Sequence, residues 1–207
     1  MIQLYGVARS RALRVSWLLE ELGLDWQFNF IDFAKGEHRS GEFLAMNPSG
    51  KVPVIRDGEV VLSESSAIMY YLAEKYGNDQ WMPAPGSPES AQLHFWVSFT
   101  ITELEQPLWT MGKHKFALPA DKRLAEIRPI AAWEFAQAAA VASKRLPATP
   151  FLTGDTITIA DLLLAHTLNW ATMFEQPLPE NLAAFRDRIS SRPTLKAALD
   201  KSLAASS

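Results

Sequence analysis

The 207-residue sequence contains no cysteine. This absence excludes structural disulfides, cysteine-based zinc sites and catalysis by a protein thiol, so any thiol chemistry must use a sulfur that the substrate brings. A strong charge of one sign is also missing, because 20 Lys and Arg against 23 Asp and Glu leave a net charge of −3. No basic block of the kind that binds nucleic acid is present. We expect no nucleic-acid partner.

Long hydrophobic runs are absent as well. No apolar stretch approaches the ~20 residues that a membrane-spanning helix needs. The chain also does not open with the charged, apolar and small-residue series of a secretory leader. The sequence therefore predicts a cytoplasmic protein that does not associate with membranes. Its 48% hydrophobic residues are sufficient for a sizeable core.

The first 76 residues or so alternate between strand and helix patterns. Apolar runs and helical spacing define most of these elements, and Asp57-Gly58 is a strong signal for a two-residue hairpin. The strands are expected at 2–5, 26–31, 53–56 and 59–62, and the helices at 12–22 and 64–76. This order predicts an α/β domain with a small mixed four-stranded sheet and helices packed on it.

A Gly- and Pro-rich segment separates this part from the rest of the chain. After it, every long segment has the period of a helix, and Pro107 and Gly112 are expected to bend or split the first one. Thr158 and Asp161 form a capping box before a buried helix, and we interpret Asp161 as structural. The predicted domains are 1–77, a linker at 78–88, and an all-α domain at 89–207.

Two short motifs indicate a ligand site. Asn47-Pro48-Ser49-Gly50-Lys51-Val52-Pro53 places a proline at the start of a strand pattern, which is rare unless that end is unpaired or the proline is cis. A turn whose backbone cannot pair within its own sheet can bind an extended peptide. Ser63-Glu64-Ser65 opens the next helix, whose free N–H groups and dipole can receive a carboxylate. Together the motifs predict a site for a small peptide-like ligand.

These motifs resemble the glutathione-binding half of the soluble glutathione S-transferases, in particular serine-type, theta-like members of the bacterial style. The resemblance covers essentially the whole chain, in the family's order: Leu4–Ser10, Lys35–His38, the Val-Pro and Ser-Glu-Ser motifs, and Thr156–Asp161. It implies a thioredoxin-like N-terminal domain, an all-helical C-terminal domain, and glutathione as co-substrate without a metal. It also implies a homodimer formed through the helix at 64–76 and the first helices of the second domain.

Ser10 stands at a strand-to-helix junction, where its simplest role is that of an N-cap. By the resemblance, it matches the hydroxyl that donates a hydrogen bond to the glutathione sulfur. A free thiol with a pKa of about 8.5 is only about 3% thiolate at pH 7, and lowering that pKa by ~2 raises the fraction to roughly three quarters. Tyr5 is the alternative, because other branches place a catalytic tyrosine there. Ala12 departs from the serine-type pattern, which often has proline at that position.

The two motifs receive binding roles from the resemblance. The backbone of Val52 would pair with the cysteinyl part of glutathione, with a cis bond before Pro53; the alternative is a trans proline on an edge strand. Glu64 and Ser65 would hold the γ-glutamyl end. Their alternative is a capping motif, with Ser63 as N-cap.

His38 and Lys51 match positions that meet the glycyl carboxylate, although a lone cation on a loop is more often simply solvated. The apolar co-substrate is expected between the two domains, and the candidates for its pocket are Ala8, Arg9, Trp109, Met111 and Phe116. No His cluster has the spacing of metal ligands.

The leading hypothesis is a transferase that joins glutathione to an electrophilic, fairly apolar small molecule. Two alternatives stay open. One is another glutathione-dependent reaction at the same site, namely isomerisation, dehalogenation or peroxide reduction. The other is a non-catalytic binding or regulatory protein with the same fold.

Overall fold

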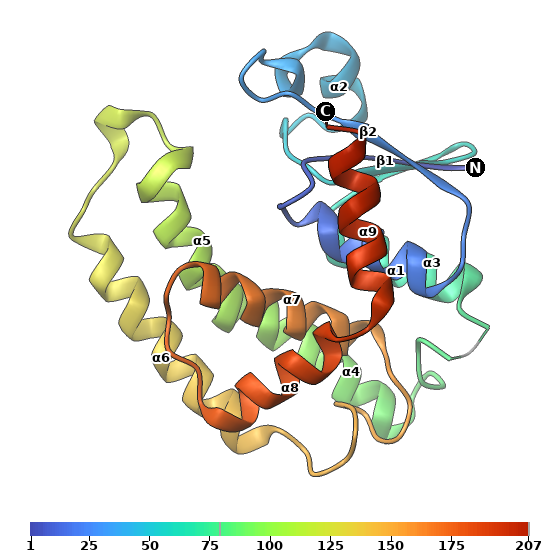
Figure 1. Ribbon diagram of the computed structural model, residues 1–207, viewed down its shortest axis with the longest axis vertical. Helices are drawn as coiled ribbons and strands as arrows, with labels where there is room; N and C mark the ends of the chain where they lie inside the picture. Colours follow the sequence, from blue (N-terminus) through green and yellow to red (C-terminus); the bar gives the residue numbers. More distant parts are fainter. Residues whose placement is uncertain (79, 207) are drawn as a thin grey trace. The chain divides into compact units, whose positions relative to one another are not determined.

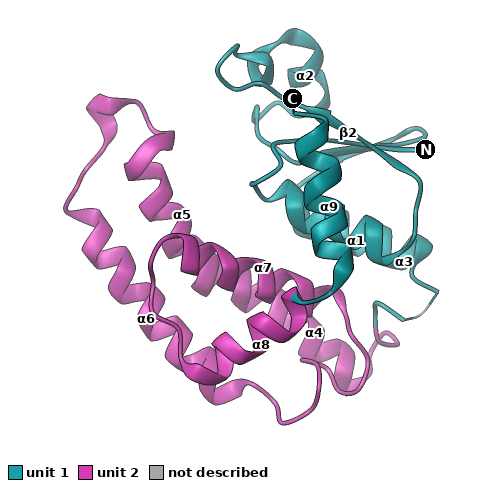
Figure 2. Ribbon diagram, in the orientation of Figure 1, with its two compact units in different colours: residues 1–82, 191–207 teal, residues 83–190 magenta. Residues whose placement is uncertain are grey.

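The computed structural model describes residues 1–78 and 80–206, which form two compact units (Figure 2). Unit 1 consists of Met1–Met82 and Ser191–Ser207, and unit 2 consists of Pro83–Ser190. The predicted helical domain at 89–207 therefore differs from unit 2 at its C-terminal end. The reason is that the last helix, α9 (Pro193–Ala204), packs against α1 (Ala12–Glu21) of unit 1.

Unit 1 contains the predicted mixed four-stranded sheet, with the strand order β2-β1-β3-β4. The strands are β1 (Ile2–Gly6), β2 (Trp26–Phe30), β3 (Val54–Asp57) and β4 (Val60–Ser63). β1 and β2 are parallel, whereas β3 is antiparallel to both β1 and β4. The final residues of β1, β2 and β4 therefore meet the first residue of β3 at one end of the sheet, which we call the carboxyl end.

Strand alternation assigns the two faces of this sheet different partners. Leu4 and Ile55 are paired and fully buried on the face covered by α1 and α3 (Ser65–Tyr76). Tyr5 and Val54 are paired on the opposite face, where they pack with Phe43. Phe43 belongs to α2 (Gly41–Met46), a short helix that follows η1 (Glu37–Arg39) and precedes β3 (Figure 1).

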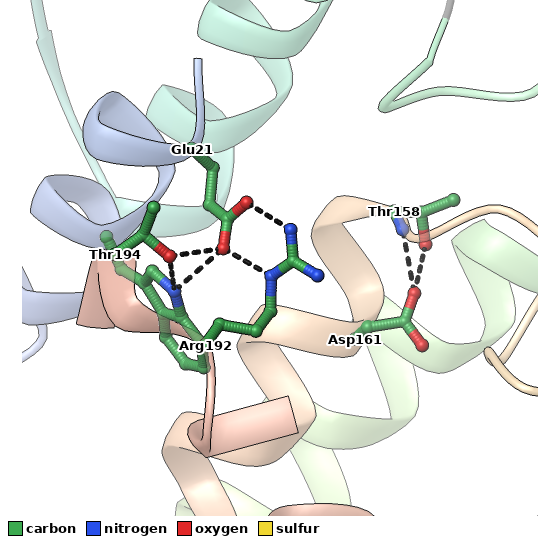
Figure 3. A network of polar contacts seen from close by, with 6 residues as sticks. Glu21, Thr158, Asp161, Arg192 and Thr194 are labelled. Carbon is green, nitrogen blue, oxygen red and sulfur yellow. Dashed lines mark hydrogen bonds and ion pairs between the residues drawn. The ribbon is translucent and has the colours of Figure 1, made fainter. Parts of the chain in front are cut away.

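A buried ionic network joins α9 to α1 (Figure 3). The Glu21 carboxylate, whose side chain is only 3% exposed, accepts hydrogen bonds from Arg192 Nε at 2.5 Å and Nη2 at 2.6 Å. Thr194 Oγ1 donates to the same carboxylate at 2.5 Å, and Trp17 Nε1 donates to it at 3.2 Å. Breaking a fully buried ion pair costs about 3–5 kcal/mol; here Arg192 is 36% exposed, so water screens part of the attraction. The network explains why residues 191–207 belong to unit 1.

The hairpin between β3 and β4 is shifted by one residue from the predicted one. Asp57 pairs with Val60, so the two-residue loop is Gly58-Glu59. Asp57 Oδ2 accepts hydrogen bonds from Tyr71 and Tyr76 hydroxyls and from Lys75 Nζ, at 2.7–2.8 Å. Burial raises the pKa of Asp57, but the hydrogen bonds from Lys75 and the two tyrosines outweigh it and leave this pKa below its usual value. These contacts from α3 hold Asp57 in the strand.

Unit 2 is helical in its described residues, and no described helix is both long and apolar enough to cross a membrane. Its elements are α4 (Pro88–Phe99), η2 (Thr100–Glu105), α5 (Gln106–Gly112), η3 (Lys113–Ala117), η4 (Ala120–Lys122), α6 (Ile127–Arg145), α7 (Ile159–Met173) and α8 (Glu180–Ser190). Pro107 and Gly112 do not split the first helix, because the backbone stays helical at the junctions from α4 to η3. Instead, η2 and η3 take the wider π-helical form next to these residues, as expected where the α-helical ladder is interrupted.

The capping box at the start of α7 is confirmed (Figure 3). Asp161 is fully buried, and its Oδ2 accepts hydrogen bonds from the Thr158 N–H at 2.8 Å and from Thr158 Oγ1 at 2.9 Å. Its Oδ1 accepts from the Leu152 N–H at 2.9 Å. Burial raises the pKa of Asp161 to about 6, although these hydrogen bonds act in the opposite direction. Asp161 thus fastens the preceding loop to the helix that it caps.

Candidate active site

The carboxyl end of the sheet gathers the residues predicted to bind glutathione. The β-strand register places the exits of β1, β2 and β4 and the entrance of β3 side by side there. The segments that follow or precede these strand ends carry Ser10, His38, Lys51, Val52, Pro53, Glu64 and Ser65. Residues distant in sequence therefore share one end of unit 1 because of the strand order.

Ser10 lies in the turn between β1 and α1. Its hydroxyl donates to the Val7 carbonyl at 2.8 Å and accepts from the Ala12 N–H at 3.1 Å. The bond from Ala12 is the capping interaction expected of an N-cap-like serine. A hydroxyl has a single proton, so Ser10 can donate to a ligand sulfur only by turning away from Val7. The helix N-terminus beside it favours a negative charge.

Tyr5 is oriented differently. Its hydroxyl donates to Gln3 Oε1 at 2.6 Å, which is two residues back toward the start of β1. Its ring packs against the cluster of Ile31, Phe43 and Val54. These contacts give Tyr5 a packing role in unit 1.

The turn before β3 has the predicted cis peptide bond, between Val52 and Pro53. Pro53 is buried, and the Val52 side chain packs against the Ile31, Phe43 and Val54 cluster. Within residues 1–78 and 80–206, neither the N–H nor the C=O of Val52 has a hydrogen-bond partner. Val52 therefore offers one donor and one acceptor in the pattern by which an extended peptide adds to a sheet.

Glu64 and Ser65 begin α3. Glu64 occupies the N-cap position of α3, and in the described structure its side chain makes no capping bond. Its φ of 67° is a strained backbone conformation for a residue other than glycine. The alternative in which Ser63 is the N-cap is wrong, because Ser63 is the last residue of β4. Ser65 is buried, and its Oγ accepts a hydrogen bond from Arg14 Nη1 at 3.3 Å. The first N–H groups of α3 have no partner within the helix.

Sequence reasoning missed Arg14. This arginine is fully buried in α1, and its contact with Ser65 brings a positive charge to the start of α3. The available signal was a charged residue within an otherwise apolar helix pattern. Buried arginine is rare unless it is paired.

His38 and Lys51 belong to loops that pack closely together. Gly50, with φ at 63°, leaves no room for a side chain, because its Cβ would lie 2.9 Å from the His38 carbonyl oxygen. The His38 ring stacks on Phe33 with 4.1 Å between ring centroids, and its buried Nδ1 has no hydrogen-bond partner among residues 1–78 and 80–206. Lys51 is exposed beside Gly50. This corner therefore carries two exposed cations, Lys51 and Arg39, and a ring nitrogen that has no hydrogen-bond partner among the described residues.

The residues predicted for an apolar pocket are divided between the units. In unit 1, Ala8 is buried and Arg9 is exposed. In unit 2, Trp109 is half-buried and Phe116 is exposed, while Met111 lines a cleft of about 400 Å³. Three charged residues of this cleft were missed, namely Lys115, Arg128 and Glu175. Within residues 1–78 and 80–206, no three acidic or His side chains gather as metal ligands.

The fold and the arrangement of this end define the class of protein. A thioredoxin-like domain with a mixed four-stranded sheet precedes an all-helical domain. The profile "Glutathione S-transferase, N-terminal domain" matches residues 1–74, and "Glutathione S-transferase, C-terminal domain" matches residues 106–193.

Individual proteins similar to this chain carry the same family name as the two profiles. Glutathione S-transferase 1 of Dianthus caryophyllus is 32% identical over 168 residues, which cover 79% of this chain and 74% of that protein. Glutathione S-transferase theta-2 of Homo sapiens is 31% identical over 176 residues, covering 81% and 71%. The structure of the glutathione transferase URE2P8 from Phanerochaete chrysosporium with oxidized glutathione is 25% identical, has a TM-score of 0.84, and covers 97% of this chain and 94% of that chain. The chain belongs to the glutathione S-transferase family.

Proposed function

We propose that this chain binds glutathione at the carboxyl end of the unit 1 sheet and transfers its thiolate to electrophilic, fairly apolar small molecules. The observation that carries the proposal is the backbone of Val52, whose N–H and C=O have no partner among the described residues. The cysteinyl residue of glutathione has the complementary C=O and N–H groups for a two-bond, sheet-like pairing. Family membership and the oxidized glutathione in the related fungal structure support this ligand.

The two ends of the tripeptide have different partners in this proposal. The γ-glutamyl carboxylate accepts from the Ser65 hydroxyl and from the free N–H groups at the start of α3, with the Arg14 guanidinium behind Ser65. Glu64 faces the γ-glutamyl ammonium. Lys51 and His38 meet the glycyl carboxylate. An anionic ligand is thus held by a helix dipole at one end and by a cation at the other.

Ser10 is the residue that we assign to the sulfur. Its hydroxyl turns from the Val7 carbonyl and donates to the thiolate, next to the positive end of α1. The thiolate then attacks the electrophilic carbon, so that a carbon–sulfur bond forms and the leaving group departs with the electron pair of its bond. Both hydroxyls donate within unit 1, Ser10 to Val7 and Tyr5 to Gln3, but Ser10 lies beside the N-terminus of α1, and this favours Ser10 over Tyr5. We therefore propose a serine-type, theta-like enzyme.

Isothermal titration calorimetry with glutathione tests the binding site. Ser65→Ala removes a hydroxyl that donates to a charged group, which is worth about 1.5–3 kcal/mol, so we expect an affinity at least 10-fold weaker. Ser66→Ala removes the same group from the next residue of α3 and is the matched control, expected to bind within two-fold of the original. The proposal fails if the unmodified chain gives no binding heat at millimolar glutathione.

We also propose that the protein is a homodimer. β4 is an edge strand of the sheet, and its Val60 and Val61 side chains are 37% and 39% exposed. Exposed apolar side chains on an edge strand indicate a covered surface in the working protein. Sedimentation equilibrium at micromolar concentration should give twice the 23.1 kDa chain mass. A monomer under those conditions contradicts the proposal.

A further inference from the structure

The segment that joins α5 to α6 has a charge opposite in sign to that of the whole chain. Residues 113–130, which we call the basic tip, contain five Lys and Arg against one Asp and one Glu, whereas the whole chain has a net charge of −3. The basic residues are Lys113, Lys115, Lys122, Arg123 and Arg128. Figure 1 shows the basic tip at the end of the α5–α6 pair, where the chain turns back. Positive charge is therefore concentrated at one end of unit 2.

Large apolar side chains are exposed among these cations. Phe116 is 56% exposed, and Leu124 and Ile130 are each 57% exposed. A single exposed apolar residue is normal on a protein surface, but three large ones so close in the sequence indicate a surface that a partner covers. The basic tip thus combines positive charge with exposed apolar side chains.

Hydrogen bonds hold the two halves of the basic tip together. Arg123 Nε donates to the Leu118 carbonyl at 2.7 Å, and its Nη2 donates to the Phe116 carbonyl at 2.9 Å. The Leu124 N–H donates to His114 Nδ1 at 3.0 Å. Phe116 and Leu124 are therefore brought to the same place by bonds that their own backbones make.

The cations near these side chains are largely not neutralised. Within residues 1–78 and 80–206, Lys113, Lys115 and Arg123 take part in no ion pair. Lys122 Nζ lies 3.0 Å from Asp121 Oδ2, but the two side chains are 70% and 68% exposed, so water screens their attraction. The basic tip therefore keeps its charge available to an anionic partner.

The exposed apolar side chains favour one kind of anionic partner. At the surface of a bilayer, apolar side chains enter the boundary between headgroups and acyl chains, while neighbouring Lys and Arg attract anionic headgroups. A nucleic-acid backbone would use the same cations, but its phosphates offer no apolar contact for Leu124 or Ile130. The composition of the basic tip therefore fits a membrane better than a nucleic acid.

We propose that the basic tip is a docking surface for membranes that contain anionic lipids. Phe116 and Leu124 insert at the level of the headgroups, and the cations beside them attract the lipid charge. Binding is reversible, because a few inserted side chains anchor a protein far less firmly than a spanning helix does. The sequence-based expectation of no membrane association rested on the absence of long apolar runs, whereas this surface is assembled from short segments. The inference does not rest on the proposed glutathione chemistry, because every residue that carries it lies in unit 2.

Flotation with lipid vesicles tests this docking surface on the full chain without glutathione. The chain should bind phosphatidylcholine vesicles that contain about 30% phosphatidylserine at least five-fold more strongly than vesicles of phosphatidylcholine alone. Raising the salt concentration from about 0.05 to about 0.5 M should remove most of this difference, because salt screens the lipid charge. Equal binding to the two kinds of vesicle, or binding to neither, would overturn the proposal.

Two variants with matched controls locate the contact. Lys115→Gln should weaken binding to the anionic vesicles about 3- to 5-fold, because one cation is lost. Leu124→Ser should weaken it about 5- to 10-fold, because an inserted apolar side chain is lost while the backbone bond to His114 remains. Lys144→Gln and Val141→Ser make the same kinds of change at exposed positions of α6 outside the basic tip, and each should stay within two-fold. Circular dichroism verifies that each variant is folded.

The variants also separate the alternatives. Losses of equal size at the control positions would show that lipid binds elsewhere on the chain and would overturn the site. Binding of a labelled DNA duplex that Lys115→Gln weakens, without vesicle binding, would assign the basic tip to nucleic acid and would overturn the membrane. Since glutathione is absent, none of these results bears on the transferase proposal.

Discussion

A Ser10→Ala variant is expected to conjugate glutathione about 10- to 25-fold more slowly than the original chain at pH 7. The estimate follows from ionisation. With the bound thiol lowered to a pKa of about 6.5, roughly three quarters is thiolate at pH 7, against about 3% at the free value of about 8.5. The N-terminus of α1 remains in the variant and retains part of the effect. The measurement is a spectrophotometric conjugation assay at saturating glutathione.

The pH profile separates this cause from a general loss of structure. At pH 9 the thiol ionises without help, so the two rates should differ by no more than about two-fold. Tyr5→Phe removes the other candidate hydroxyl and should keep the rate within two-fold at both pH values. A Ser10→Ala variant with full activity at pH 7, together with an inactive Tyr5→Phe variant, would assign the role to Tyr5.

An Asp161→Ala variant is expected to lose about 3 kcal/mol of unfolding free energy at pH 7. The N–H groups of Leu152 and Thr158 donate to the Asp161 carboxylate in a buried site. Each buried donor left without an acceptor costs about 1–3 kcal/mol. Asp155→Ala removes an exposed acid from the same loop and should change stability by less than about 0.5 kcal/mol. Urea unfolding followed by circular dichroism measures both.

The effect of Asp161→Ala should depend on pH in a defined direction. The pKa of Asp161 is about 6 in the folded chain, against an ordinary value of 3.8 for an aspartate, so the folded state binds more protons between these values. The part of the stability that protonation of Asp161 contributes is therefore complete below pH 3.8 and is lost as the pH rises through 6, whereas the hydrogen bonds to its carboxylate remain at pH 7. At about 1.4 kcal/mol per pH unit, the difference between the two chains should be about 2 kcal/mol larger at pH 4.5 than at pH 7. A difference that grows with pH would contradict the raised pKa.

The sequence predicted those elements whose position depends on residues that are close together along the chain. Apolar alternation located the four strands, and the capping box at Thr158 and Asp161 marked the start of α7. The hairpin loop was shifted by one residue because Asp57 is held by tyrosines that lie 14 and 19 residues further along the chain. The place of α9 was missed for the same reason, since its ion pair joins residues 171 positions apart. Pairings over such distances leave no local pattern.

In the candidate site, too, the sequence predicted the residues placed by the strand order but not those placed by contacts between helices. Val52 precedes β3, and Glu64 and Ser65 follow β4, so that the strand order alone brings them to one end of the sheet. Arg14 could not be predicted, because its contact with Ser65 depends on how α1 and α3 pack. The charges of the unit 2 cleft also come from segments that are far apart in the sequence and meet only in the folded unit.

The ion pair between Glu21 and Arg192 has a consequence for how the chain is made. A ribosome completes the sheet of unit 1 within the first 63 residues, yet the arginine that neutralises Glu21 is 171 residues further on. At about 5–20 residues per second, roughly 9–34 s pass before Arg192 is synthesised. Glu21 of α1 therefore lacks its arginine partner while the whole of unit 2 is synthesised. Unit 1 therefore obtains its last packing partner, α9, only after unit 2 has been synthesised.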